Sequence, residues 1–258
     1  MKKTNEHFIC AENLTIAYGD NVVVRNLNFT VNRGDIFVIM GMSGCGKSTV
    51  MRSIIGLIRP ISGHIFIDGI DFWNAPEIQR NKIIETFGIS FQSGALFSSM
   101  TIYENVALPL EMKTDLAKKE IAKQVKEKLE LVGLAEYADF YPSEISGGMV
   151  KRAALARAMI TNPRVLFFDE PAAGLDPVRA KSLDDLISHI SKETKTTIIM
   201  VTHELDSIMT IATNSVYIDS ETRTITGAGN PRQLLRTTKN HQIIDFLTRE
   251  KTHIGGKK

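Results

Sequence analysis

The sequence has little cysteine, no long apolar run and almost no net charge. Its two cysteines, Cys10 and Cys45, are too few for a disulfide framework and stand in no metal-binding spacing, which favours a reducing compartment. No apolar stretch approaches the roughly 18 residues that cross a bilayer, and the N-terminal residues are polar, so we expect neither a membrane span nor a signal peptide. A net charge of +2 gives no reason to expect nucleic acid as a partner.

The hydrophobic pattern changes along the chain. Apolar residues alternate with polar ones between residues 9 and 31, which predicts half-buried antiparallel strands. Later apolar runs are short, continuous and separated by helical segments, which predicts a parallel sheet with crossover helices. These runs are residues 35–40, 165–168, 197–201 and 216–218. The fold class is therefore α/β, with an antiparallel β subdomain at the N-terminal end.

The middle of the chain differs from both patterns. Residues 96–160 show helical signals and no convincing strand. Ile121, Val125 and Leu129 recur every four residues between lysines and glutamates, as on an amphipathic helix. We predict a second, alanine-rich helix over residues 146–161. This stretch is interpreted as a helical subdomain inserted in an α/β core that covers residues 1–250, with 251–258 as a short tail.

A glycine-rich loop follows the first buried strand. Residues 41–48, GMSGCGKS, fit the pattern G-x-x-x-x-G-K-S/T, with a strand before them and a helix from Lys47 after them. Backbone N–H groups of such a loop cradle phosphate oxygens, and the helix dipole adds a favourable field. Lys47 would reach the β- and γ-phosphates of a nucleotide, and the Ser48 hydroxyl would reach Mg²⁺. The alternative is a glycine-rich turn that contains a lysine by chance. Such a turn would need neither the strand before it nor the helix after it.

Two carboxylates end a later buried strand. Asp169 and Glu170 follow residues 165–168, and ligands of open α/β sheets bind at the C-terminal ends of strands. Asp169 is predicted to hold Mg²⁺ through water, and Glu170 to act as the general base on an attacking water. Taken alone, the pair could also be a solvated acidic turn. Ser146, Gly147 and Gly148 precede the alanine-rich helix as an N-cap that could bind an anion or merely cap the helix.

Together these motifs resemble the nucleotide-binding subunit of an ABC transporter, a P-loop NTPase. Phe91-Gln92 matches the Q-loop, residues 145–149 the signature, residues 173–176 the D-loop with Asp176, and His203 the switch histidine. The signature differs from the usual L-S-G-G-Q at both ends, because Ile145 stands in place of the leucine and Met149 in place of the glutamine. On their own, Gln92 would be a surface polar residue and His203 a structural histidine.

The resemblance implies a complete set of site residues. Glu170, His203, Lys47 and Gln92 would be catalytic, with ATP and Mg²⁺ as cofactors and Ser48, Gln92 and Asp169 near the metal. Tyr18 matches the aromatic residue that stacks on adenine. Ser146, Gly147 and Gly148 would meet the ATP of a second copy in a head-to-tail dimer. The implied ATP contacts are Tyr18, Gly41, Ser43, Gly44, Cys45, Gly46, Lys47, Ser48, Thr49, Gln92, Asp169 and His203.

A finer resemblance concerns the partners. Residues 91–97, 105–110 and 142–149 are similar to the ATPase of Mla-type, MCE-associated phospholipid transport systems. That family implies membrane permease subunits, an MCE-type lipid-binding protein, a small regulatory subunit, and a peripheral position on the cytoplasmic side of the inner membrane. The alternatives are the ATPase of another ABC importer or of a lipoprotein-release system, and a soluble ABC ATPase outside transport.

The C-terminal segment carries a further apolar pattern. Leu234, Leu235, Ile243, Ile244, Phe246 and Leu247 place apolar groups on one face of short helices between residues 231 and 249. This face could pack on its own core. It could also hold the dimer or a partner, with residues 252–258 as a clasp.

Overall fold

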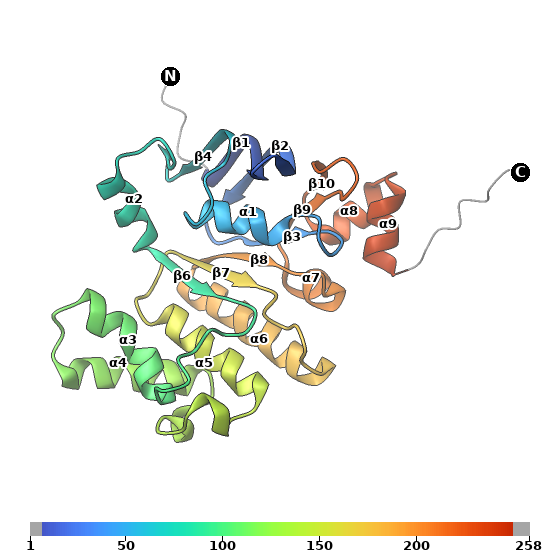
Figure 1. The fold of residues 1–258 in the computed structure, drawn as a ribbon. Coiled ribbons are helices and arrows are strands. Elements are labelled where there is room, and N and C mark those ends of the chain that lie inside the picture. Colours follow the sequence, from blue (N-terminus) through green and yellow to red (C-terminus); the bar gives the residue numbers. More distant parts are fainter. Residues whose placement is uncertain (1–6, 250–258) are drawn as a thin grey trace, which may run out of the picture. The chain divides into compact units, whose positions relative to one another are not determined.

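The computed structural model describes residues 7–249, which form two compact units (Figure 1). Among the described residues, the first unit comprises 7–75 and 201–249, and the second comprises 76–200. The phosphate loop belongs to the first unit, whereas the acidic strand end and the helical region belong to the second.

An antiparallel sheet occupies the N-terminal part of the first unit, as the alternating pattern predicts. Its strand order is β2-β1-β4-β5. Leu14, Ile16 and Val24 are fully buried on one face, and a tight turn at Gly19 and Asp20 joins the two longest strands. The strands are β1 (His7–Tyr18), β2 (Asn21–Asn32), β4 (Ser62–Ile67) and β5 (Ile70–Asp71).

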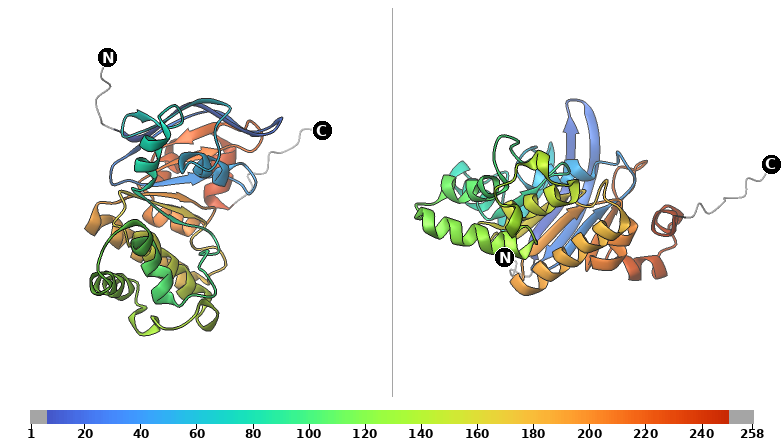
Figure 2. Two further views of the ribbon diagram at one scale, coloured as in Figure 1. Left: turned by 60° about the vertical axis from the view of Figure 1, so that its left-hand side comes forward. Right: turned by 90° about the horizontal axis from the view of Figure 1, so that it is seen from below.

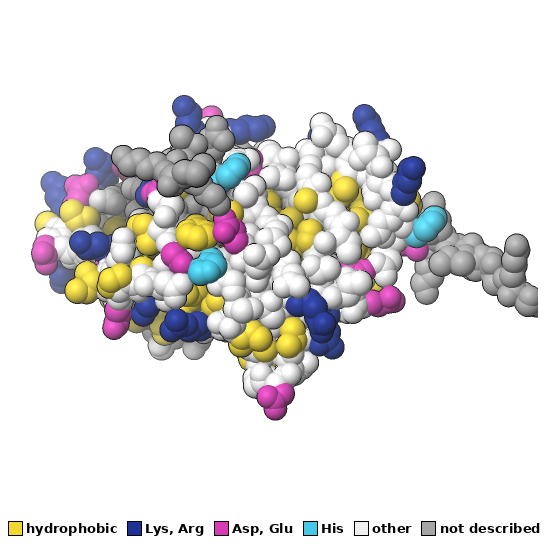
Figure 3. All heavy atoms as spheres, turned by 90° about the horizontal axis from the view of Figure 1, so that it is seen from above, with side chains coloured by type: hydrophobic (Ala, Val, Ile, Leu, Met, Phe, Trp, Pro, Cys, Tyr) yellow, Lys and Arg dark blue, Asp and Glu magenta, His cyan; other side chains and the backbone are white. Residues whose placement is uncertain are grey.

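Charged groups on the first unit are balanced locally. The face shown in Figure 3 carries both basic and acidic side chains. Arg33 pairs with Asp68, and His64 lies 2.7 Å from Asp71. Exposed pairs of this kind contribute little to stability.

The first unit contains a second set of strands, which pair in both parallel and antiparallel orientation. β3 pairs with β9 in parallel, and β9 pairs with β10 in antiparallel orientation. Every residue of β3 is buried, as expected of a strand covered on both faces. The helix that follows the phosphate loop ends at Ile54, and Leu57 N then donates to Arg52 O at 2.8 Å. The elements are β3 (Ile36–Met40), α1 (Lys47–Ile54), α7 (Leu205–Ile211), β9 (Asn214–Ile218) and β10 (Ile225–Ala228).

The second unit contains strands β8, β7 and β6 as neighbours in that order. β6 and β7 run parallel, and all five residues of β7 are buried. The sequence pattern predicts β7 and β8, but it does not reveal β6, whose four residues include Gly88. The elements are α2 (Glu77–Ile84), β6 (Phe87–Ser90), β7 (Val165–Asp169), α6 (Pro177–Thr194) and β8 (Thr197–Val201).

The helical region of this unit agrees with the sequence prediction, because residues 96–160 contain helices and no strand. Ile121, Val125 and Leu129 are buried on one side of α4. Figure 2 shows the three long helices grouped together, in green to yellow. They are α3 (Ile102–Lys113), α4 (Lys118–Leu131) and α5 (Gly147–Met159), with short 3-10 turns at Ala135–Tyr137 and Pro142–Glu144.

The two C-terminal helices pack on the first unit. They are α8 (Pro231–Thr237) and α9 (His241–Thr248). Ile243 and Leu247 are buried, and the Phe246 ring lies 5.3 Å from the Tyr217 ring of β9. This packing favours the interpretation in which the apolar face covers its own core. The predicted clasp, residues 252–258, lies outside the described residues.

Candidate nucleotide site

The phosphate loop connects β3 to α1 within the first unit. Gly41 and Gly46 have φ angles of 151° and 101°, which favour glycine. A Cβ on Gly41 would lie 2.5 Å from Ile218 O, and one on Gly46 would lie 2.8 Å from Val23 Cγ1. The loop is therefore enclosed by β9 and β2 at these two glycines. Ser43 and Gly44, between them, are exposed.

The loop lysine is held by the loop itself. Lys47 Nζ donates to Gly41 O and Met42 O, each at 3.0 Å, and the residue is only 6% exposed. Its positive charge therefore lies over the loop at the start of α1. Ser48 and Thr49 follow in the first turn of the helix. Burial raises the pKa of the Cys45 thiol while the Lys47 charge lowers it, and the net effect keeps the thiol protonated.

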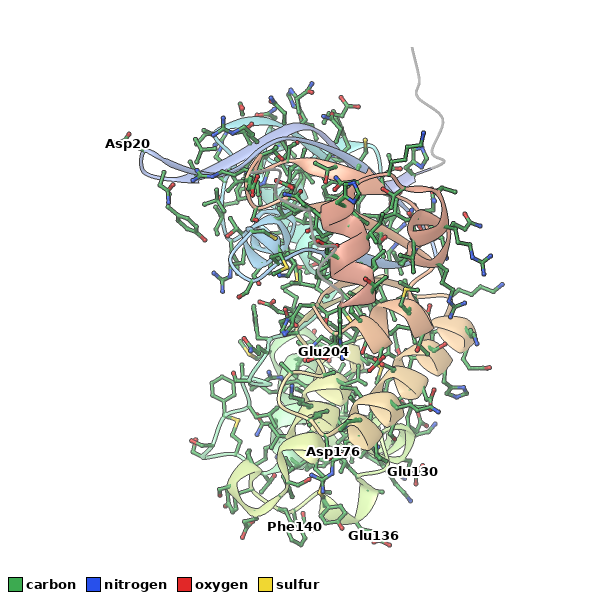
Figure 4. All side chains as sticks on the ribbon, turned by 90° about the vertical axis from the view of Figure 1, so that its right-hand side faces the viewer. Asp20, Glu130, Glu136, Phe140, Asp176 and Glu204 are labelled. Carbon is green, nitrogen blue, oxygen red and sulfur yellow. The ribbon has the colours of Figure 1, made fainter. Side chains whose placement is uncertain are left out.

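Tyr18 ends β1 beside the hairpin turn. It pairs with Asn21 across the hairpin and is 49% exposed. Figure 4 shows Asp20 at the tip of the same hairpin. A half-exposed ring at this position has a free surface on which a planar base can stack.

His203 lies just after β8, in the first unit. Its side chain is 51% exposed, and Nε2 lies 3.9 Å from Glu204 Oε1. Glu204 in turn lies 4.0 Å from Arg249 at the end of α9. About half of the His203 side chain is therefore accessible to a ligand.

The acidic pair ends β7 in the second unit. Asp169 and Glu170 are 6% and 8% exposed, so both carboxylates are buried. Glu170 has a φ of 50°, a conformation that few non-glycine residues adopt and that turns the chain sharply after the strand. Lys151 of α5 is the nearby cation: burial lowers its pKa, whereas the Glu170 charge raises it.

The Q-loop follows β6 and packs against α5. Gln92 is exposed, and two residues later Gly94 is buried. Arg157 of α5 donates to Gly94 O and Ala95 O, both at 2.8 Å. Burial lowers the pKa of Arg157. The guanidinium therefore fixes the backbone directly after Gln92.

A buried asparagine fixes the rest of this segment. Asn105 of α3 is fully buried, and its Oδ1 accepts from Phe97 N at 2.7 Å. Its Nδ2 donates to the carbonyl oxygens of Phe97, Met100 and Thr101. One amide group thus satisfies four backbone groups of the loop.

The signature residues form the N-terminus of α5. Ser146 is the N-cap and accepts from Met149 N at 3.4 Å, and Ser146 and Gly147 are exposed. Asp176 caps α6 by accepting from Val178 N and Arg179 N, and it is one of the residues labelled in Figure 4. A cavity of about 150 Å³ lies between the two helix starts, lined by Ser146, Gly148, Met149, Arg152, Leu175, Arg179 and Leu183.

α5 also holds two further loops of the second unit. Lys151 Nζ donates to Pro171 O at 2.8 Å and to Ala173 O, in the segment that follows Glu170. Arg152 donates to Val132 O at the end of α4 and to Ser182 Oγ of α6.

The predicted site residues are divided between the units. The first unit carries Tyr18, residues 41–49 and His203, while the second carries Gln92, Ser146, Gly147, Gly148, Asp169, Glu170 and Asp176. Sequence reasoning missed Asn105, Lys151 and Arg157, which support the loops. Lys151 and Arg157 are six positions apart, which does not place them on one face of a helix, so no local spacing indicates their role.

Comparison with known sequences assigns the class. The model of the ABC transporter family matches residues 24–173, more than half of the chain. The chain therefore belongs to the ABC transporter family.

The relatives of this chain have names that refer to different transported substances. The chain is 38% identical over 246 residues to the intermembrane phospholipid transport ATP-binding protein MlaF of Haemophilus influenzae, which covers 95% of the chain and 92% of the relative. It is 40% identical over 234 residues to the probable ribonucleotide transport ATP-binding protein Mkl of Mycobacterium tuberculosis, covering 91% of the chain but 64% of that relative. It is 44% identical over 201 residues to the Fe(3+) ions import ATP-binding protein FbpC of Pasteurella multocida, covering 78% of the chain and 56% of the relative.

Solved structures give the same fold. CbiO1 of Clostridium perfringens, part of the ABC transporter complex CbiONQ, matches with a TM-score of 0.82 and 29% identity, covering 95% of this chain and 97% of that one. The dimeric ABC transporter cassette MJ0796 matches with a TM-score of 0.78 and 29% identity, covering 86% and 98%. The predicted fold class, an ABC-type P-loop NTPase, is confirmed. Between residues 7 and 249, no helix has the length and apolarity needed to cross a membrane.

Proposed function

We propose that this chain binds and hydrolyses ATP as the energy-supplying subunit of an ABC transporter. The observation that carries the proposal is the phosphate loop, where Lys47 lies on the carbonyl oxygens of Gly41 and Met42 at the start of α1. A cation and a helix N-terminus at one glycine-rich loop form a binding site for nucleotide phosphates. Tyr18 then supplies an exposed ring for adenine.

The hydrolytic step is assigned to the second unit. Glu170 would take a proton from water, whose oxygen attacks the γ-phosphorus while the bond to the β-phosphate oxygen breaks, giving ADP and phosphate. Lys151 of α5 lies within electrostatic reach of Glu170 and bonds to the carbonyl oxygens of Pro171 and Ala173, in the segment that follows this carboxylate. Gln92 and His203 would orient the water and the γ-phosphate.

The donor set fits Mg²⁺. Ser48, Gln92 and Asp169 offer hydroxyl, amide and carboxylate oxygens, which are the ligands that Mg²⁺ prefers. In the part of the chain that the structure describes, no three His, Cys, Asp or Glu residues form a metal site. An ion held mainly by nucleotide phosphates, with Asp169 bound through water, would need no such cluster. Such an ion would neutralise phosphate charge.

A second copy of the chain is the proposed first partner. Ser146, Gly147 and Gly148 are exposed or half-exposed at the start of α5, which allows an anion to approach the helix N-terminus. In a head-to-tail pair they would meet the γ-phosphate of the other copy's ATP, and Asp176 would lie at the dimer interface. The structure of the cassette MJ0796 is dimeric, which supports the pairing of two copies.

Phospholipid transport is the proposed process. The similarity to MlaF along 95% of the chain supports it, together with the resemblance of residues 91–97 and 105–110 to Mla-type ATPases. The partners would be membrane permease subunits, an MCE-type lipid-binding protein and a small regulatory subunit, with the ATPase peripheral to the cytoplasmic face of the inner membrane. The similarity to FbpC supports an alternative, the ATPase of another importer.

Two variants test ATP binding and hydrolysis separately. Lys47→Ala should lose ATP affinity because its charge meets the phosphates in the ground state. Glu170→Gln should bind ATP normally while turnover falls by about 10²–10⁴-fold, the range for a general base. The matched controls are Lys123→Ala and Glu136→Gln, exposed residues of the second unit. Normal ATP affinity of Lys47→Ala, or normal turnover of Glu170→Gln, would contradict the assignment.

A separate experiment tests the transport branch. The tagged chain would be purified with its own membranes in mild detergent, and the co-purifying proteins identified by mass spectrometry. Recovery of a permease with an MCE-domain protein would support phospholipid transport. Recovery of a permease with a periplasmic iron-binding protein would support the alternative.

A further inference from the structure

The β1–β2 hairpin contains an irregularity close to the phosphate loop. Ile16 and Ala17 are consecutive in β1, yet they pair with Val24 and Val22 of β2. Val23 is therefore an extra residue in β2, a β-bulge. Bulges break the regular ladder and redirect the strand, and this one lies two residues after Asn21, the hairpin partner of Tyr18.

The bulge contacts the phosphate loop. A Cβ on Gly46 would lie 2.8 Å from Val23 Cγ1 and 2.7 Å from Val24 Cγ1, so these two side chains pack directly on the loop glycine. Tyr18 pairs with Asn21, two residues before Val23. One short piece of β2 therefore connects the base side of the proposed site with its phosphate side.

β2 is an edge strand in the order β2-β1-β4-β5, so β1 satisfies the backbone groups on only one of its sides. Arg223, in the turn between β9 and β10, bonds to β2 on either side of the bulge. Its guanidinium donates through Nη1 to Val22 O, and its own carbonyl oxygen accepts from Arg25 N at 2.8 Å. Arg223 thus bonds to β2 residues on both sides of Val23.

The turn that carries Arg223 is itself well fixed. The Asp219 carboxylate is 2% exposed and accepts from Glu221 N, Thr222 N and Thr222 Oγ1 at 2.7 to 3.0 Å. Arg223 N donates to Asp219 O at 2.9 Å. The turn begins directly after Ile218, whose carbonyl oxygen borders Gly41. The turn therefore joins β2 to the strand beside the start of the phosphate loop.

We propose that Arg223 is a positioning residue for nucleotide binding, which fixes the bulge at Val23 and thereby sets the place of Tyr18 relative to the phosphate loop. The inference rests on the proposed function, because it takes Tyr18 as the platform for the base. Arg223 makes no contact with the nucleotide in this proposal. Its loss should therefore affect ligands that carry a base and spare those that carry only phosphates.

The test compares ATP with inorganic triphosphate, both with Mg²⁺, on the full chain by calorimetry. Arg223→Ala should weaken ATP binding by about three- to tenfold, less than the loss of a stacking ring itself. The affinity for triphosphate should change by less than about twofold. Arg223→Lys keeps one donor and should recover part of the ATP affinity. Arg33→Ala, an exposed arginine just beyond β2 that pairs with Asp68, is the matched control and should change neither affinity.

A double variant shows whether Arg223 acts through Tyr18. Arg223→Ala in a Tyr18→Ala background should cost almost nothing further, because the platform that it positions is gone. Unchanged ATP affinity in Arg223→Ala would overturn the proposal. Additive losses of ATP affinity in the double variant would also overturn the proposal. Equal weakening of ATP and triphosphate binding would do the same. In both cases, Arg223 would act on nucleotide binding by a route that does not pass through Tyr18. Failure of the proposed function looks different: the parent chain would bind neither ligand.

Discussion

The phosphate loop and the Q-loop segment, residues 91–101, hold their shapes by different means. In the phosphate loop, Lys47 bonds to carbonyl oxygens five and six residues earlier, and Cys45 N bonds to Met42 O. The Q-loop segment depends on side chains from helices, Arg157 of α5 and Asn105 of α3.

The two segments should therefore differ in how rigid they are and in how far neighbouring helices control their shape. A loop with bonds inside itself depends less on side chains from other elements, which suits the binding of a constant group such as a phosphate. A loop held by two helices follows those helices, so its shape responds to anything that shifts them. The following variants test this contrast, beginning with the largest expected effect.

Asn105→Ala should produce the largest loss of stability. It removes the side-chain partner of Phe97 N and Met100 O and a second donor from Phe97 O and Thr101 O, which should lower the free energy of unfolding by about 2–4 kcal/mol. Urea denaturation would measure this loss. The control is Asn81→Ala at an exposed position of α2, where alanine should be harmless. An equal, small effect of both variants would mean that the segment holds itself.

Arg157→Ala should have an intermediate effect. Loss of two bonds from a half-buried guanidinium should lower the free energy of unfolding by about 1–3 kcal/mol. Arg157→Lys should recover only part, because an ammonium lacks the planar fork that reaches both carbonyl oxygens. Hydrogen exchange should increase at residues 94–97 in both variants. Full recovery with lysine would show that charge, rather than geometry, fixes the loop.

Tyr18 provides a smaller effect, on binding rather than on stability. Tyr18→Phe should be nearly silent because the ring remains, and Tyr18→Ala should weaken ATP binding by about 1–2 kcal/mol. Titration with a fluorescent ATP analogue would measure both. Equal affinities of the three proteins would show that adenine does not stack on this residue.

Cys45 should give the smallest effect. Its buried thiol has a raised pKa, so less thiolate is present at pH 8 than for a free thiol, and an alkylating reagent should react slowly. Counting labels in a Cys10→Ala background measures that rate. Cys45→Ala should bind ATP almost as the parent does, because the loop contributes backbone groups. Rapid labelling of Cys45 in the folded chain would show that the phosphate loop opens.

The contrast also explains what the sequence could predict. The phosphate loop, β3 and β7 follow from local patterns: a glycine motif and continuous apolar runs. The division of residues 96–160 into helices follows from the spacing of Ile121, Val125 and Leu129. All of these signals lie within about ten residues of one another, where periodicity is informative.

The features that were missed depend on distant partners. β6 and β10 have four residues each, and β4 begins with the exposed Ser62, so none has a clear period of its own. Arg157 acts on residues more than 60 positions away, and Arg223 acts on residues about 200 positions away. Such contacts carry no local pattern, and only the folded chain reveals them.

The way in which α5 side chains hold neighbouring loops affects how the sequences of those loops can diverge. Arg152, Lys151 and Arg157 bond mainly to backbone carbonyl oxygens of three separate loops. A carbonyl oxygen is present whatever side chain a residue carries, so mutations in those loops leave the anchor points intact. The loops can therefore acquire new side chains, and with them new partners, while one helix keeps their backbones in place.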